Sequence, residues 1–189
     1  MSRTDQTICE NEWLSLRITR DPAAGVEGYV YSHESRCAGR IVALLPYRRT
    51  DRGNQFLLKS EITPCWSYEP VLSAITGGYE GADIADDAVR ELLEETGYAI
   101  SRDQLIPLGQ SYASKSSDTV YDLFSVNLTG LEPGEANGDG TRLEAGSLAV
   151  WLGKDDLLQV KDPQVALMYL RLREHFLDQF FAASDGLEN

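Results

Sequence analysis

A change of hydrophobic period in the middle of the chain most constrains its fold. Residues 72–76 have the pattern of a short strand, which runs straight into the glycine-rich turn GGYEGAD. The period then becomes helical, and the residues predicted to share one side of this helix are Ala85, Val89, Leu92, Leu93 and Thr96. Asp83 is suited to cap the start of the helix, and Gly97 stands where a helix usually ends. A strand, a loop and a helix are therefore predicted in succession.

Further strands are predicted on both sides of this unit. Breakers such as Asp-Pro and Asp-Arg-Gly-Asn separate the apolar runs 13–18, 28–33, 39–45, 55–60, 104–113, 119–128 and 147–152. A second long helix is predicted from Asp162-Pro163, with an apolar stripe of Val165, Met168, Leu172, Phe176 and Phe180. Strands outnumber helices, which favours an α/β sandwich whose helices cover a sheet.

The chain is expected to form a single domain over residues 1–189. Its length is enough to bury one core, and no internal repeat is visible. The glycine-rich stretch 130–140 has the composition of one loop. The net charge of −13 makes a nucleic-acid polymer or an anionic membrane an unfavourable partner.

The cysteines and the N-terminal residues predict a cytoplasmic location. Cys9, Cys37 and Cys65 are odd in number and widely spaced, so they indicate neither a disulfide framework nor a zinc site. The first residues lack the apolar stretch of a secretory signal, and the longest apolar run, 41–46, is too short to span a bilayer.

Three carboxylates of the first predicted helix indicate metal chemistry. At 3.6 residues per turn, Glu91, Glu94 and Glu95 share one face within an arc of about 100°. Like charges at this spacing repel, and acids in the last turn oppose the helix dipole, so we expect a cation there. Magnesium uses carboxylates together with substrate phosphates. The alternative is a solvated acidic helix face.

The run from Arg90 to Tyr98, RELLEETGY, resembles the second half of the Nudix signature, Gly-x5-Glu-x7-Arg-Glu-U-x-Glu-Glu-x-Gly-U with U apolar. The resemblance implies a Nudix-like α/β/α sandwich with a mixed sheet over about 36–189, preceded by N-terminal antiparallel strands over about 1–35. It also implies that Glu91, Glu94 and Glu95 bind Mg²⁺ or Mn²⁺. A main-chain carbonyl at Gly77 would be a further ligand, and Arg90 would orient the carboxylates.

The first half of the signature departs from the family pattern. Counting back from Arg90, Ala82 takes the place of the first signature glutamate and Thr76 that of the glycine. Gly77 and Gly78 are present, but the loop between them and Arg90 is two residues shorter than usual. Glu80 or Asp83 would then replace the missing carboxylate.

The implied reaction is hydrolysis of a nucleoside diphosphate linked to another group X, giving a nucleoside monophosphate and phospho-X. In relatives that cleave ADP-ribose, the base often comes from a loop after the motif. Glu144 is our candidate for that base, with Glu135 and Asp139 as competitors. The alternative for each is a solvated loop acid.

Basic residues gather in the first half of the chain despite its acidic total. The segment 36–59 carries six cations against one acid, and we expect Arg40 and Arg48 to reach the substrate together with Gly77, Gly78 and Glu80. The alternative is that half or more of these cations are solvated. Aromatic side chains suited to stack on a base are Tyr29, Tyr31 and Trp66, although aromatic residues in strands more often belong to a core.

The resemblance favours ADP-ribose or another nucleotide sugar as the substrate, and the family's habits suggest a homodimer through the N-terminal strands. A second hypothesis is a Nudix-fold sensor that binds a nucleotide without cleaving it, because Ala82 and the short loop depart from the signature. A purely structural domain fits the acidic face poorly.

Overall fold

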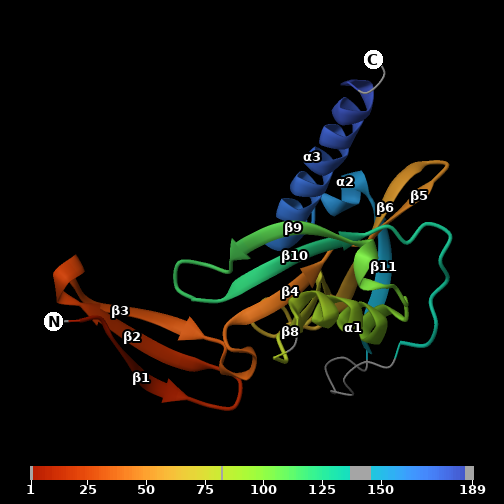
Figure 1. The fold of residues 1–189 in the computed structure, drawn as a ribbon. Helices are drawn as coiled ribbons and strands as arrows, with labels where there is room; N and C mark the ends of the chain where they lie inside the picture. The colour runs from red at the N-terminus through yellow and green to blue at the C-terminus, as the bar shows by residue number, and fades with distance from the viewer. Residues whose placement is uncertain (1, 82, 137–145, 186–189) are drawn as a thin grey trace.

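The computed structural model describes residues 2–81, 83–136 and 146–185, with side chains of the last helix described up to Leu177. Strands β1 (Thr4–Glu10), β2 (Ser15–Asp21) and β3 (Val26–His33) form an antiparallel sheet. This sheet projects to one side of the remaining elements (Figure 1). N-terminal antiparallel strands were predicted, although β1 itself was not.

A second sheet has the order β8-β4-β10-β9. Its strands are β4 (Arg40–Leu44), β8 (Ile75–Gly78), β9 (Leu105–Tyr112) and β10 (Val120–Val126). β4 and β10 pair in parallel, whereas β4–β8 and β9–β10 pair antiparallel, so this sheet is mixed.

A third sheet has the order β11-β6-β5, and β7 also pairs with β6. Its strands are β5 (Tyr47–Thr50), β6 (Gly53–Glu61), β7 (Val71–Ser73) and β11 (Leu148–Gly153). The single strand predicted over 72–76 is therefore two strands, because Ala74 separates β7 from β8 and each belongs to a different sheet. The β5–β6 hairpin was predicted only in its second strand.

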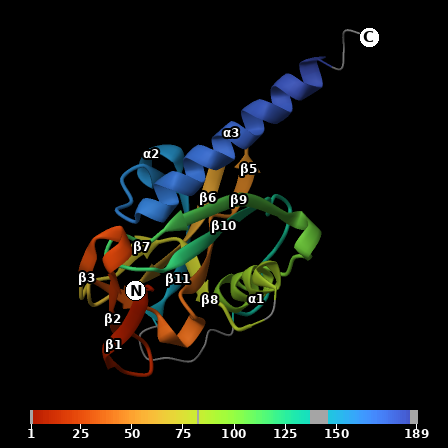
Figure 2. The same cartoon turned by 60° about the vertical axis from the view of Figure 1, so that its left-hand side comes forward.

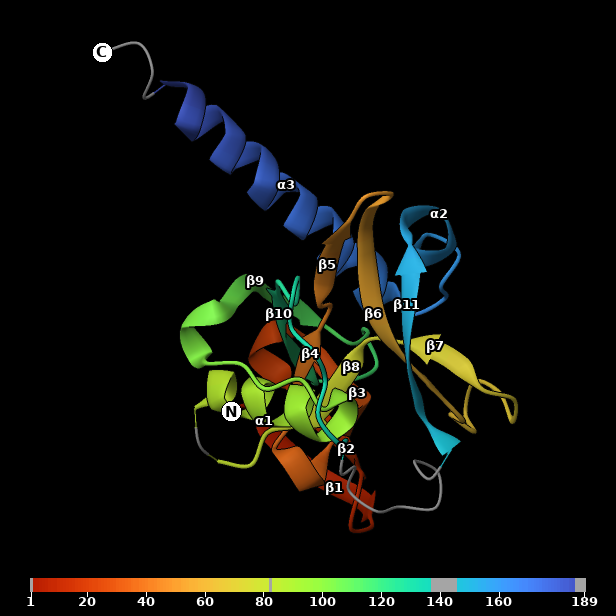
Figure 3. The ribbon, with the colours of Figure 1, turned by 90° about the vertical axis from the view of Figure 1, so that its right-hand side faces the viewer.

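Three α-helices are described: α1 (Ile84–Thr96), the short α2 (Lys154–Leu157) and α3 (Pro163–Asp185). Short 3-10 turns lie at Pro22–Ala24, Ser35–Cys37 and Arg102–Gln104. Figures 2 and 3 show that the second half of α3 runs well past the edge of the sheets. None of the described helices is long and apolar enough to cross a membrane.

Alternation along β4 divides the core into two layers. Val42 and Leu44 pack with residues of α1, whereas Ala43 and Leu45 pack with residues of α3, since successive strand residues point to opposite faces. In β6, likewise, Leu57 belongs to the α1 layer and its neighbours to the α3 layer. The second and third sheets thus lie between α1 and α3, which confirms the predicted α/β/α sandwich.

Candidate active site

Local sequence fixes both ends of α1. The Asp83 side chain accepts a hydrogen bond from Ala85 N at 2.9 Å, as the capping prediction required. Gly97 ends the helix with φ 74°, a left-handed conformation that favours glycine. Ala88 and Leu92 are fully buried against the sheets and hold the helix on β4 and β8.

The predicted separation of α1 into an apolar side and an acidic side holds for Leu92 and Thr96 but not for Leu93 or Glu91. Leu93 is 40% exposed, while Glu91 is only 9% exposed and Asp87 only 3%. The carboxylates border the buried stripe, so part of the acidic face lies against the sheet. The Glu91 carboxylate fits there because Gly77, in the adjacent strand β8, has no side chain.

Arg90 is the centre of the carboxylate cluster. Its Nη1 atom lies 3.0 Å from Glu91 Oε1 and 2.9 Å from Glu94 Oε2. Its Nη2 atom lies 3.2 Å from Asp87 Oδ1 and 3.4 Å from Glu80 Oε1. One guanidinium therefore contacts four carboxylates, from α1 and from the loop before it.

Glu91 reaches the floor of this cluster through a gap in β8. A Cβ atom on Gly77 would overlap the Glu91 carboxyl carbon, so the absence of a side chain at Gly77 makes space for the glutamate. Burial raises the pKa of Glu91 to about 7; Arg90 works against this shift, and Glu94 and Glu95 add to it. A further cation near Glu91 would therefore stabilise its ionised form.

Glu95 has a different partner. Its Oε2 atom lies 2.7 Å from Lys59 Nζ, and the same ammonium lies 3.0 Å from Glu61 Oε2. Burial alone would lower the pKa of Lys59, but its hydrogen bonds with Glu95 and Glu61 outweigh this and raise it. Lys59, one of the six cations of segment 36–59, is thus buried and paired with a carboxylate of α1.

The loop before α1 contributes Glu80 and not Asp83 to the cluster. Glu80 lies within reach of Arg90, whereas Asp83 is occupied by capping and by an ion pair of 2.7 Å with Arg102. Ala82 lies outside the described residues. Gly78 packs against the Cys37 side chain, where an added Cβ would come within 3.1 Å of Cys37 Cβ.

Asp87 was missed by the sequence reasoning, although it stands four residues before Glu91 and so on the same helix face. Its Oδ1 pairs with Arg90 and its Oδ2 accepts from Glu80 N at 3.4 Å. It joins the loop to the helix. The spacing rule that found the other carboxylates would have found this one.

The cations of segment 36–59 do not form one patch. Arg40 pairs with Asp122 at 2.8 Å and lies over the Tyr79 ring, beside the end of β8. Arg48 stacks 4.2 Å above the Trp151 ring, which belongs to the α1 layer of the core. Both arginines remain near the α1 side, each already held by a partner.

The structure describes one of the three acids considered as the base. Glu144 and Asp139 fall outside the described residues. Glu135 is described and exposed. Its neighbour Gly134 donates a backbone hydrogen bond to Gly97 O at 2.8 Å, so the loop crosses the C-terminal end of α1 close to the cluster.

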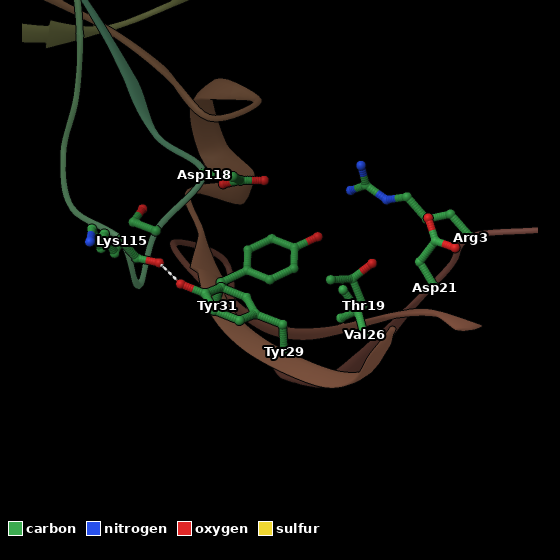
Figure 4. A pocket seen from close by; sticks show the side chains of 9 residues that line it. Arg3, Thr19, Asp21, Val26, Tyr29, Tyr31, Lys115 and Asp118 are labelled. Carbon is green, nitrogen blue, oxygen red and sulfur yellow. Dashed lines mark hydrogen bonds between the residues drawn. The ribbon is translucent and has the colours of Figure 1, made fainter. Parts of the chain in front are cut away.

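Two cavities of the described residues lie away from the carboxylates. One, of about 310 Å³, is bounded by β2, β3 and the loop after β9, with Tyr29 and Tyr31 among its walls and the Tyr29 hydroxyl donating to Lys115 O (Figure 4). The other, of about 550 Å³, lies between the β5–β6 hairpin, α2 and α3. Trp66 is 56% exposed and lines neither of them.

The donor set fits a hard divalent cation in charge and in chemistry. Among the residues that the structure describes, six carboxylates face two cations in this cluster: Glu61, Glu80, Asp87, Glu91, Glu94 and Glu95 against Lys59 and Arg90. Carboxylate oxygens are the ligands that Mg²⁺ prefers. Within the described ranges no three acidic, histidine or cysteine side chains yet converge on one point, because the carboxylates turn to Arg90 and Lys59.

Solved structures of other proteins share this architecture. No family model and no curated protein matches the sequence. Solved structures do match, and the chain has the Nudix fold, as the resemblance implied.

Two of these structures are an ADP compounds hydrolase and the NUDIX domain of Shewanella oneidensis NrtR complexed with ADP ribose. The first is 18% identical, with a TM-score of 0.66, and the match covers 95% of this chain and 96% of the other. The second is 14% identical, with a TM-score of 0.56, and covers 72% and 87%.

Proposed function

We propose that this protein is a divalent-metal-dependent hydrolase of nucleoside diphosphates linked to a group X, with ADP-ribose or another nucleotide sugar as substrate. The products would be a nucleoside monophosphate and phospho-X. The observation that carries the proposal is the excess of carboxylates around Arg90 and Lys59, one of them the buried Glu91. The names of the two structural neighbours favour an ADP-containing substrate.

Different residues of the cluster would bind the metal and hold its ligands in place. Glu91, Glu94 and Glu95 would hold Mg²⁺ or Mn²⁺ together with the Gly77 carbonyl. The ion, when bound, neutralises diphosphate charge and lowers the pKa of water. Arg90 would keep Glu91 and Glu94 in place through its ion pairs.

Substrate contacts would come from the rim of this cluster. Arg40 and Arg48 would bind phosphate oxygens, and Gly78 and Glu80 would line the approach. A loop acid would take the proton of the attacking water. Glu144 remains our candidate for that base, with Glu135 and Asp139 as the competitors.

A product assay tests the proposal. The purified protein is incubated with ADP-ribose and other nucleoside diphosphate derivatives in Mg²⁺, the products are separated, and oxygen from isotopically labelled water is located in them. Glu94→Gln should lower turnover by about 100-fold or more, because it removes a negative charge that would bind the metal. The Glu94 side chain is 38% exposed, so the substitution should change the stability of the fold little. Glu174→Gln, in an exposed helical glutamate paired with Arg173, is the matched control and should keep wild-type turnover.

Binding without cleavage is the other informative outcome. The alternative hypothesis of a nucleotide sensor predicts that ADP-ribose binds but that no product forms, either with or without Mg²⁺. Wild-type turnover by Glu94→Gln in saturating Mg²⁺ would refute the assignment of the cluster.

A further inference from the structure

Lys59 is a buried cation in β6, on the side of the sheet that α1 covers. It follows Leu57 by two residues in β6, so both point to the α1 side of the sheet, as does Glu61. In the sheet register Lys59 stands directly opposite Ser73 of β7 and Ala149 of β11. Its side chain is 7% exposed. A charge so enclosed is costly unless its partners compensate for it.

The partners of Lys59 include a carboxylate that the Nudix resemblance assigns to metal. Glu95 Oε2 lies 2.7 Å from the ammonium nitrogen, and the Glu95 side chain is 6% exposed. Glu61 Oε2 lies 3.0 Å from the same nitrogen. The ion-pair distances are those of charge-assisted hydrogen bonds. In this arrangement, Glu95 is bound by lysine rather than directed to the Arg90 side of the cluster.

We propose that Lys59 competes with the divalent cation for Glu95, so that metal binding breaks the Lys59–Glu95 ion pair and the lysine sets the metal affinity. This inference rests on the proposed function, because it takes the carboxylates of α1 as the metal-binding group. An ammonium and a divalent ion repel each other at short range, so one carboxylate does not hold both without cost. Lys59 is a positioning residue here and contacts no substrate.

Ser73 offers the ammonium a further hydrogen-bond acceptor besides Glu95 and Glu61. Its Oγ atom is buried and has no hydrogen-bond partner among the described residues, and the residue is 6% exposed. Residues directly opposite on antiparallel strands have Cβ atoms about 5 Å apart and share a face. Ser73 therefore lies on the face of the sheet from which the Lys59 side chain projects, and its unpartnered hydroxyl would accept a hydrogen bond from the ammonium once Glu95 has turned to the metal.

Mn²⁺ binding, measured by calorimetry and by electron paramagnetic resonance, tests the competition without an activity assay. Lys59→Met should bind Mn²⁺ at least about tenfold more tightly than the wild type, because Glu95 and Glu61 lose the cation that competes with the metal for them. Lys59→Arg keeps the charge and should bind Mn²⁺ as the wild type does. Adding Glu95→Gln to Lys59→Met should abolish the gain. Unchanged or weaker Mn²⁺ binding by a folded Lys59→Met variant overturns the inference.

Ser73→Ala tests the competition between Lys59 and the metal if Lys59→Met does not fold. Removing the Ser73 hydroxyl should weaken Mn²⁺ binding by about threefold or more, without lowering the melting temperature of the metal-free protein. Unchanged Mn²⁺ affinity in this variant counts against the competition. The two proposals fail separately: no Mn²⁺ binding by the wild type refutes the metal site itself, whereas wild-type binding that ignores Lys59 and Ser73 refutes only the competition.

Discussion

The Glu91 carboxyl group occupies the space that a side chain on Gly77 would fill. A Cβ atom built on Gly77 overlaps the carboxyl carbon and the preceding methylene of Glu91. The glycine of β8 and the glutamate of α1 therefore form one unit, in which a missing side chain on the sheet lets a carboxylate approach the backbone.

Gly77→Ala should displace Glu91 and weaken metal binding. The overlap involves a carboxyl group that is already enclosed, so the helix or the glutamate must shift. We expect Mn²⁺ affinity to fall by about tenfold or more, as for other losses around a metal site, measured by calorimetry. Gly153→Ala is the control, because a Cβ there meets nothing within 4 Å. Full Mn²⁺ affinity in Gly77→Ala would show that Glu91 is not required where the structure places it.

Glu91 should make the metal-free protein less stable as the pH rises from about 4.5 to about 7. Its pKa is raised from 4.5 to about 7 in the folded state, chiefly by burial, so the folded protein binds this proton more tightly than the unfolded chain does. The stability that the proton confers is lost as the pH passes through this window.

Denaturant unfolding at several pH values tests this linkage. The difference in stability between Glu91→Gln and the wild type should move in favour of the glutamine variant between pH 4.5 and 7, because the amide does not ionise. A difference that stays constant across that window would contradict a raised pKa.

Gly97→Ala should destabilise the protein and loosen the loop that crosses α1. Gly97 has φ 74°, and an added Cβ would overlap the Gly134 carbonyl oxygen. The conformational cost alone is about 1–2 kcal/mol. Gly130→Ala isolates that cost, since Gly130 has φ 79° with nothing within 4 Å of an added Cβ. Denaturant unfolding should show a larger loss for Gly97→Ala; equal losses would mean that the loop contact contributes nothing.

Asp162→Ala should cost more than the loss of an ordinary helix cap. Asp162 is 6% exposed; its Oδ1 accepts from Gln164 N and its Oδ2 from Ala74 N, each at 2.9 Å. Removal leaves a buried Ala74 N–H without its partner, so we expect a loss of about 2–3 kcal/mol. Asp83→Ala, which removes an exposed cap, should lose less in thermal unfolding. Similar losses would indicate that the link to Ala74 is weak.

The elements of this protein were largely predictable because they depend on short-range periodicity. The helix of residues 84–96, its capping by Asp83 and its end at Gly97 follow from a local pattern of apolar, acidic and glycine residues. The strand pattern likewise predicted most of β2 to β11. The break at Ala74 was not predictable, since one apolar run supplies strands to two sheets.

The sequence by itself determined that three glutamates and Arg90 share one side of a helix, because 3.6 residues per turn places them there wherever the helix lies. Only the tertiary structure decided how that helix meets the sheet. The register of β6 brings Lys59 to Glu95, and β8 brings Gly77 beneath Glu91, although these partners are 36 and 14 residues apart in the chain. Such pairings depend on which strands become neighbours, and helix periodicity carries no information on that.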